Sequence, residues 1–185
     1  MPAGSRIRVV LVDDHHMFRE ALRDLLATVE NIEIVGEAQD AHTAFALVER
    51  EKPDVAVIDL ALPGLDGIAA AQEIRHRSST TRTLILSGSS RAENASRALA
   101  AGVDGFAIKA QWSEELLVAI WAVARGERYV APQLESVLQG SAYRGTHDRV
   151  VTSVHSGWGG GVSVHGTSGG HAGVATAVHS FEVWA

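Results

Sequence analysis

Residues 55–59 read Val-Ala-Val-Ile-Asp, an unbroken apolar run that ends in a carboxylate. Three other segments have the same form: residues 9–14 end in two aspartates, residues 84–87 in a serine, and residues 106–109 in a lysine. Apolar runs of this length, separated by helical patterns, are typical of parallel strands that are buried on both faces. The carboxyl ends of parallel strands meet at one edge of a sheet, where α/β proteins bind ligands. The sequence therefore predicts three acids, a hydroxyl and a lysine at one edge.

Helical spacing of apolar residues follows each predicted strand. Phe18, Leu22 and Leu26 give the first helix face, and a second short strand is predicted at residues 32–35. Pro63 and Gly64 mark a turn after the third strand, with the glycine available for a positive φ. The pattern predicts five βα units, which form an α/β fold with a doubly wound, five-stranded parallel sheet.

Composition limits the classes of function. The 185-residue chain is 46% hydrophobic and 21% charged, which indicates a globular core. It has no cysteine, so disulfides and thiolate catalysis are excluded. No apolar run approaches membrane-spanning length, so we expect a cytoplasmic protein without a membrane partner. The net charge of −6 argues against binding to nucleic acid.

The character of the chain changes after Gly140. Residues 141–185 hold 9 of the 18 glycines and 5 of the 9 histidines, and they show no helical periodicity. The histidines do not have the spacing of metal ligands, so we interpret them as adventitious. Because glycine raises the entropic cost of ordering, we expect a disordered low-complexity tail, with proteolytic cleavage near residues 140–145. The composition also fits translation in an altered reading frame.

The strand-end residues suit phosphoryl chemistry. Asp13 and Asp14 repel each other unless a cation lies between them, and Mg²⁺ prefers oxygen ligands. Asp59 is a candidate nucleophile, because a carboxylate that attacks phosphorus forms an acyl phosphate. Lys109 supplies a second positive charge, and the hydroxyl of Ser87 supplies a further contact for a phosphoryl group.

These motifs resemble the receiver domain of bacterial two-component response regulators. The resemblance rests on Leu11-Val12-Asp13-Asp14-His15, on the run from Ile58 to Gly67, and on Gly105-Phe106-Ala107-Ile108-Lys109. The NarL/FixJ-type branch is the most similar, and it implies a flavodoxin-like sheet of order 2-1-3-4-5. On this resemblance, residues 6–125 are the receiver domain, residues 126–140 a linker and residues 141–185 the tail.

The resemblance also implies roles for individual residues. Asp59 accepts phosphate from a sensor histidine kinase. Asp14, Asp59 and the backbone carbonyl of Ala61 bind Mg²⁺, and Asp13 contributes through water. Lys109 and Ser87 contact the phosphoryl group, and the side chain of Phe106 reports it as a switch residue together with Ser87. On this resemblance, the protein is a self-phosphorylating switch with slow autodephosphorylation rather than a multi-turnover enzyme. A second copy of the chain is a further expected partner, in a homodimer that forms on phosphorylation.

Two other functions compete with this interpretation. Full-length members of the branch are DNA-binding transcription regulators, but residues 141–185 show no helix-turn-helix pattern and only Arg144 and Arg149 are basic there. A phosphatase of the haloacid-dehalogenase type also uses a strand-end aspartate and Mg²⁺. It needs a second aspartate two residues after the nucleophile as its general acid, and that position is Ala61.

Overall fold

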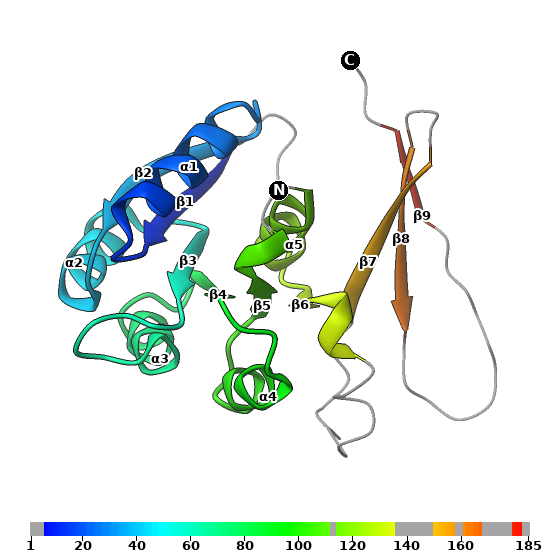
Figure 1. The fold of residues 1–185 in the computed structure, drawn as a ribbon. Coiled ribbons are helices and arrows are strands. Elements are labelled where there is room, and N and C mark those ends of the chain that lie inside the picture. The colour runs from blue at the N-terminus through cyan, green and yellow to red at the C-terminus, as the bar shows by residue number, and fades with distance from the viewer. Residues whose placement is uncertain (1–5, 112–113, 136–149, 158–160, 168–178, 183–185) are drawn as a thin grey trace.

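The computed structural model describes residues 6–111, 114–135, 150–157, 161–167 and 179–182. Strands and helices alternate through the first 130 residues (Figure 1). The strands of this part are β1 (Ile7–Val12), β2 (Ile32–Ala38), β3 (Val55–Asp59), β4 (Arg82–Ser87), β5 (Gly105–Ile108) and β6 (Arg128–Val130). The helices are α1 (His16–Ala27), α2 (Ala41–Glu51), α3 (Gly67–Arg77), α4 (Ala92–Ala100), the short 3₁₀ helix η1 (Lys109–Gln111) and α5 (Glu114–Ala124).

The six strands form one parallel sheet in the order β2-β1-β3-β4-β5-β6. The predicted α/β fold and the order 2-1-3-4-5 are therefore confirmed. The prediction of five strands was one strand short, because β6 lies in the segment interpreted as a linker and pairs with β5 through Gly105↔Tyr129 and Phe106↔Val130. A strand of three residues is too short to show a period in the sequence.

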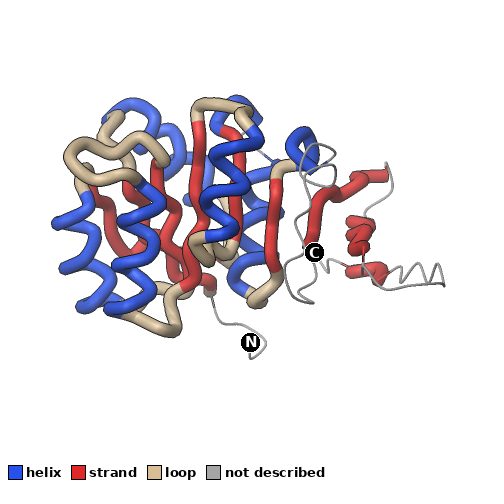
Figure 2. The backbone as a smooth tube through the Cα atoms, turned by 90° about the horizontal axis from the view of Figure 1, so that it is seen from below, coloured by secondary structure: helices blue, strands red, loops and turns tan. Residues whose placement is uncertain are grey.

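Helices cover both faces of the sheet (Figure 2). Side chains alternate between the faces along each strand, so Val10 and Val12 pack on one side while Val9 and Leu11 pack on the other. The first side is covered by α2, α3 and α4, and the second by α1 and α5. This double burial is the reason why the strands read as continuous apolar runs.

Capping residues fix where the helices begin. The carboxylate of Asp40 accepts a hydrogen bond from the backbone N–H of Thr43 at 2.7 Å at the start of α2. The carboxylate of Asp66 accepts one from the N–H of Ile68 at 2.8 Å at the start of α3. An N-cap carboxylate satisfies an amide that has no partner within the helix.

Three more strands are described in the tail. β7 (Val150–Gly157) pairs with β6, β8 (Gly161–Thr167) runs antiparallel to β7, and β9 (His179–Glu182) runs antiparallel to β8. The tail was expected to be disordered, although the sequence of β8 contains the alternating segment Val162-Ser163-Val164. Mobility is a dynamic property, and it stays a prediction for these strands. The expected cleavage segment, residues 140–145, lies outside the described residues. Two of the five tail histidines, His147 and His171, lie outside them as well.

Candidate functional site

The register of the sheet brings the strand ends together. Val12 pairs with Ile58, Asp59 with Leu86, and Ser87 with Ile108. Asp13 and Lys109 directly follow their strands, whereas Asp59 and Ser87 are the last residues of theirs. All four residues therefore lie at the carboxyl edge of the sheet, where the sequence predicts the ligand site.

Lys109 forms the centre of the charged contacts. Its Nζ lies 2.6 Å from Asp13 Oδ2 and 3.0 Å from Asp59 Oδ2. The two carboxylate side chains are 4% and 3% exposed, and that of Lys109 is 16% exposed. The ammonium also lies 4.4 Å from the ring centroid of Phe18 on α1, within range of a cation–π interaction. Lys109 is thus held by two anions and one aromatic face.

The carboxylates are only partly satisfied. Asp13 Oδ1 accepts a hydrogen bond from the backbone N–H of His15 at 2.8 Å, and Asp59 Oδ1 accepts a long one from the N–H of Ala61 at 3.3 Å. Asp59 Oδ2 is buried and accepts no hydrogen bond from the described residues, so its ion pair with Lys109 is its stabilising contact. A buried carboxylate oxygen without a hydrogen bond lowers the stability of the fold, and it can accept a contact from a ligand.

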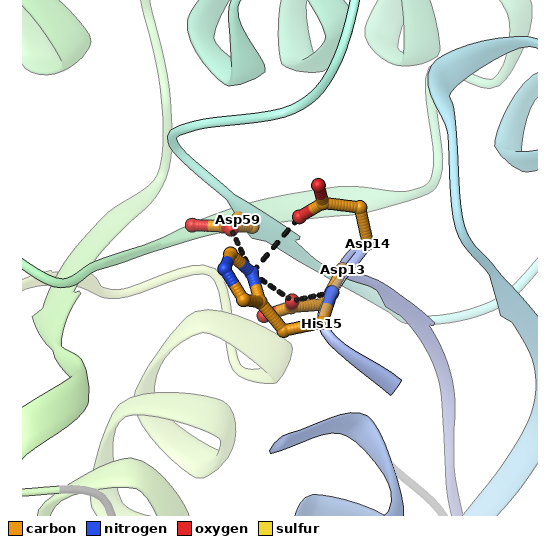
Figure 3. A group of neighbouring side chains, drawn as sticks. All are labelled: Asp13, Asp14, His15 and Asp59. Carbon is orange, nitrogen blue, oxygen red and sulfur yellow. Dashed lines mark hydrogen bonds and ion pairs between the residues drawn. The ribbon is translucent and has the colours of Figure 1, made fainter. Parts of the chain in front are cut away.

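His15 lies among the same acids (Figure 3). Its Nδ1 is 2.9 Å from Asp14 Oδ1, 3.3 Å from Asp13 Oδ1 and 3.7 Å from Asp59 Oδ2. Asp14 itself is more open, with 37% of its side chain exposed. One ligand atom from each of these four residues can be chosen so that all lie within 4.8 Å of one another. The group has the size of a single ion's coordination shell.

These residues fit a divalent cation. The site combines three carboxylates with a single ammonium, which contacts two of them, so a dication would balance the remaining negative charge. The hydrogen-bond-free oxygen of Asp59 points to the same conclusion. Asp13, Asp14 and Asp59 come from two neighbouring strands and offer oxygen ligands from within one small volume.

The two predicted switch residues lie in closed environments. Ser87 is 1% exposed, and its hydroxyl donates to the carbonyl of Ser89 at 2.9 Å while accepting from the N–H of Ser89 at 3.1 Å. Phe106 is fully buried in the core that also contains Ala95 and Leu99 of α4. Contact of Ser87 with a phosphoryl group, and movement of Phe106, stay predictions.

Sequence reasoning assigned no role to three residues that the structure places around the acids. His15 follows the acid pair directly, and imidazole is a common metal ligand, so its signal was present in the motif. Phe18 was interpreted only as part of a helix face. Arg19 donates to the backbone carbonyl of Asp13 at 2.5 Å and to Glu37 at 3.2 Å, which ties α1 to the ends of β1 and β2. No local pattern predicts those contacts.

The comparisons with known proteins agree with this geometry. The profile of the response regulator receiver domain matches residues 9–121. The chain belongs to the response regulator receiver family. Its fold is the receiver fold that the sequence motifs predict.

Individual relatives support the same assignment. The "Probable transcriptional regulatory protein NarL" of Mycobacterium tuberculosis is 35% identical over 139 residues, which is 75% of this chain and 64% of that protein. The nitrate/nitrite response regulator protein NarL of Escherichia coli is 33% identical over 79% of this chain and 68% of that protein. The chain therefore spans about two thirds of the length of these relatives.

Solved structures match the receiver domain in three dimensions. The receiver domain of NarL from M. tuberculosis aligns with a TM-score of 0.63 and 34% identity, over 66% of this chain and 99% of that one. A LuxR-family response regulator from Aurantimonas sp. aligns with a TM-score of 0.70 and 35% identity, over 74% of this chain and 98% of that one. Among the described residues, no helix is both long and apolar enough to cross a membrane.

Proposed function

We propose that this receiver domain accepts a phosphoryl group on Asp59 from a sensor histidine kinase, with Mg²⁺ held by the neighbouring acids. The observation that carries the proposal is the state of Asp59. Its carboxylate is buried at the end of a central strand, one of its oxygens accepts no hydrogen bond, and the ammonium of Lys109 lies 3.0 Å from that oxygen. This oxygen is not occupied by a structural hydrogen bond, which supports its role as the attacking atom.

The reaction is a transfer between two protein side chains. A carboxylate oxygen of Asp59 attacks the phosphorus of a phosphohistidine on the kinase. The O–P bond of an acyl phosphate forms while the N–P bond breaks, and the leaving imidazole keeps the electron pair of that bond. Water later attacks the same phosphorus and returns Asp59 to its carboxylate, with release of inorganic phosphate.

Several groups of the site would together stabilise the charge of the phosphoryl group. Mg²⁺, when bound by Asp13, Asp14, Asp59 and the backbone carbonyl of Ala61, would neutralise negative charge on the phosphoryl oxygens. Lys109 would exchange its ion pair with Asp59 for one with a phosphoryl oxygen. The hydroxyl of Ser87 would have to leave the carbonyl of Ser89 in order to donate to the phosphoryl group.

Signal output follows from that rearrangement. Ser87 ends β4 and Phe106 lies in β5, so movement of either residue changes the surface formed by α4, β5 and α5. We place the reaction in the cytoplasm, where ATP is available to the kinase as the source of its phosphoryl group. Homodimerisation of the phosphorylated chain is part of the proposal, and light scattering before and after acetyl phosphate treatment would measure it.

The decisive experiment is labelling with a small phosphodonor. Acetyl phosphate and Mg²⁺ should add one phosphoryl group to the chain, detected by intact mass, and Asp59→Asn should abolish the addition. Asp24→Asn is the matched control, because the side chain of Asp24 lies on α1 with 77% exposed. Undiminished labelling of Asp59→Asn would refute the assignment, as would equal loss in the control.

Transcription regulation is the second candidate, and the name of the M. tuberculosis relative is the observation that favours it. A gel shift with promoter DNA tests it directly. Binding that falls with salt and is lost when residues 141–185 are deleted would favour this candidate over an output through protein contacts alone.

A further inference from the structure

Among the four residues of the acidic group, His15 is the one with a nitrogen ligand. It is the residue before α1, with extended backbone angles of φ −79° and ψ 97°, and its side chain makes no capping hydrogen bond. The ring is 66% exposed, yet Nδ1 is directed between the carboxylates of Asp13, Asp14 and Asp59 (Figure 3). The orientation of the imidazole is therefore explained neither by helix capping nor by burial.

The separations between these atoms match ligands around one ion. Metal bonds of about 2.1 Å place adjacent ligand atoms about 3.0 Å apart in an octahedron and about 3.4 Å apart in a tetrahedron. His15 Nδ1 lies 2.9 Å from Asp14 Oδ1, 3.3 Å from Asp13 Oδ1 and 3.7 Å from Asp59 Oδ2. Small shifts in the ring would bring all three distances into that range.

A second observation points to a ligand at the same place. Asp59 is 3% exposed, and its Oδ2 accepts no hydrogen bond from the described residues, although it faces His15. Lys109 contacts this oxygen from the protein side, at 3.0 Å. A cation seated beside His15 would satisfy the oxygen that the protein leaves without a hydrogen bond.

The nitrogen changes which metals the site prefers. Mg²⁺ is a hard ion that selects oxygen ligands, whereas Co²⁺, Ni²⁺ and Zn²⁺ also bind imidazole well. We propose that the site is a mixed nitrogen–oxygen site, in which His15 Nδ1 joins the three carboxylates to bind first-row transition dications more tightly than Mg²⁺. The inference rests on the proposed function for the location of the Mg²⁺ site and adds the metal class that His15 selects.

His16 provides a matched control next to His15 in the chain. Its side chain is 70% exposed, and its Nδ1 lies 3.4 Å from Glu20 one turn along α1 rather than among the acids. Removal of His16 therefore removes the same chemical group from the next position in the chain, the first residue of α1, without removing a ligand atom from the site. Because the His15 side chain is also exposed and makes no cap bond, His15→Ala should fold normally, as circular dichroism would check.

The test measures Co²⁺ and Mg²⁺ affinities of the full chain by calorimetry. Other histidines also bind Co²⁺, so the relevant event is the Co²⁺ binding that saturating Mg²⁺ competes away. His15→Ala should weaken that event by at least about 10-fold, because even outer-shell partners of metal ligands contribute about 10- to 100-fold, and it should leave the Mg²⁺ affinity unchanged. His16→Ala should change neither affinity, and Asp14→Asn should weaken both.

The outcomes separate this inference from the proposed function. Mg²⁺ binding that depends on Asp14, together with Co²⁺ binding that is unaffected in His15→Ala, would refute the nitrogen ligand and leave the phosphoacceptor proposal intact. Equal losses for both metals in His15→Ala would also refute the proposed selectivity. Absence of Mg²⁺ binding in the wild-type chain would contradict the proposed function itself, whatever His15 does with Co²⁺.

Discussion

Gly67→Ala should damage both the stability of the fold and the geometry of Asp59. Gly67 is the first residue of α3, and its N–H donates to the carbonyl of Leu60 at 3.0 Å. A Cβ atom at this position would lie 2.2 Å from the carbonyl oxygen of Asp59 and 2.9 Å from Cα of Leu60. Both are backbone atoms, so no side-chain rotation relieves the overlap. Either α3 or the backbone of Asp59 and Leu60 has to move.

The magnitude follows from two opposing effects. Overpacking typically costs about 1–3 kcal/mol, and a backbone overlap this close belongs at the upper end. The better helix propensity of alanine returns at most about 1 kcal/mol. The free energy of unfolding should therefore fall by about 2 kcal/mol. Labelling of Asp59 by acetyl phosphate should slow as well, because its backbone is one of the two groups that can move.

Urea unfolding and the rate of labelling measure the two effects, with two glycine variants for comparison. Gly88→Ala meets no atom within 4 Å, so its stability should stay within about 0.5 kcal/mol of wild type. Gly64 also has open space but a φ of +77°, so Gly64→Ala should cost about 1–2 kcal/mol through backbone strain alone. A Gly67→Ala chain as stable as Gly88→Ala, with normal labelling, would refute the steric argument.

Three further predictions concern buried polar groups. Lys109→Met leaves the carboxylates of Asp13 and Asp59 without the ammonium of Lys109, so the free energy of unfolding in the absence of metal should fall by about 3 kcal/mol. Added Mg²⁺ should restore part of that stability in thermal melts. Identical melts for variant and wild type would contradict this. Burial, and to a lesser extent the charge of Glu115, raises the pKa of Tyr129 far above its usual value. The phenol of Tyr129 therefore ionises at a lower pH in the unfolded chain than in the folded chain, so stability should decline as the pH rises above about 10. Urea midpoints measured across that range should fall more steeply in wild type than in Tyr129→Phe. Parallel declines would rule out Tyr129 as the cause. Ser87→Ala removes both hydrogen bonds to the backbone of Ser89 and should lower the free energy of unfolding in urea by about 1–2 kcal/mol. The Mg²⁺ affinity should stay unchanged. A change in Mg²⁺ affinity would place Ser87 in the metal site instead.

The sequence by itself determined the first five strands, the helices between them and the residues at the strand ends. A strand such as β3, buried on both faces, needs an apolar side chain at every position, and an amphipathic helix such as α1 needs one every three or four. These requirements are local, so they are visible as periods in the chain. Parallel pairing then places Asp59 and Lys109 at the same edge without knowledge of a single contact.

Tertiary structure alone decided which of those side chains touch. Lys109 and Asp13 are 96 positions apart, and their 2.6 Å contact depends on the register of β1, β3, β4 and β5 together. The ring of Phe18 reaches Lys109 because α1 begins next to the carboxyl end of β1. The strand β6 forms because its three residues pair with the edge of β5. The direction of the His15 ring is likewise a product of the whole site. Such contacts have no period in the sequence, because each depends on how elements distant in the chain pack against one another.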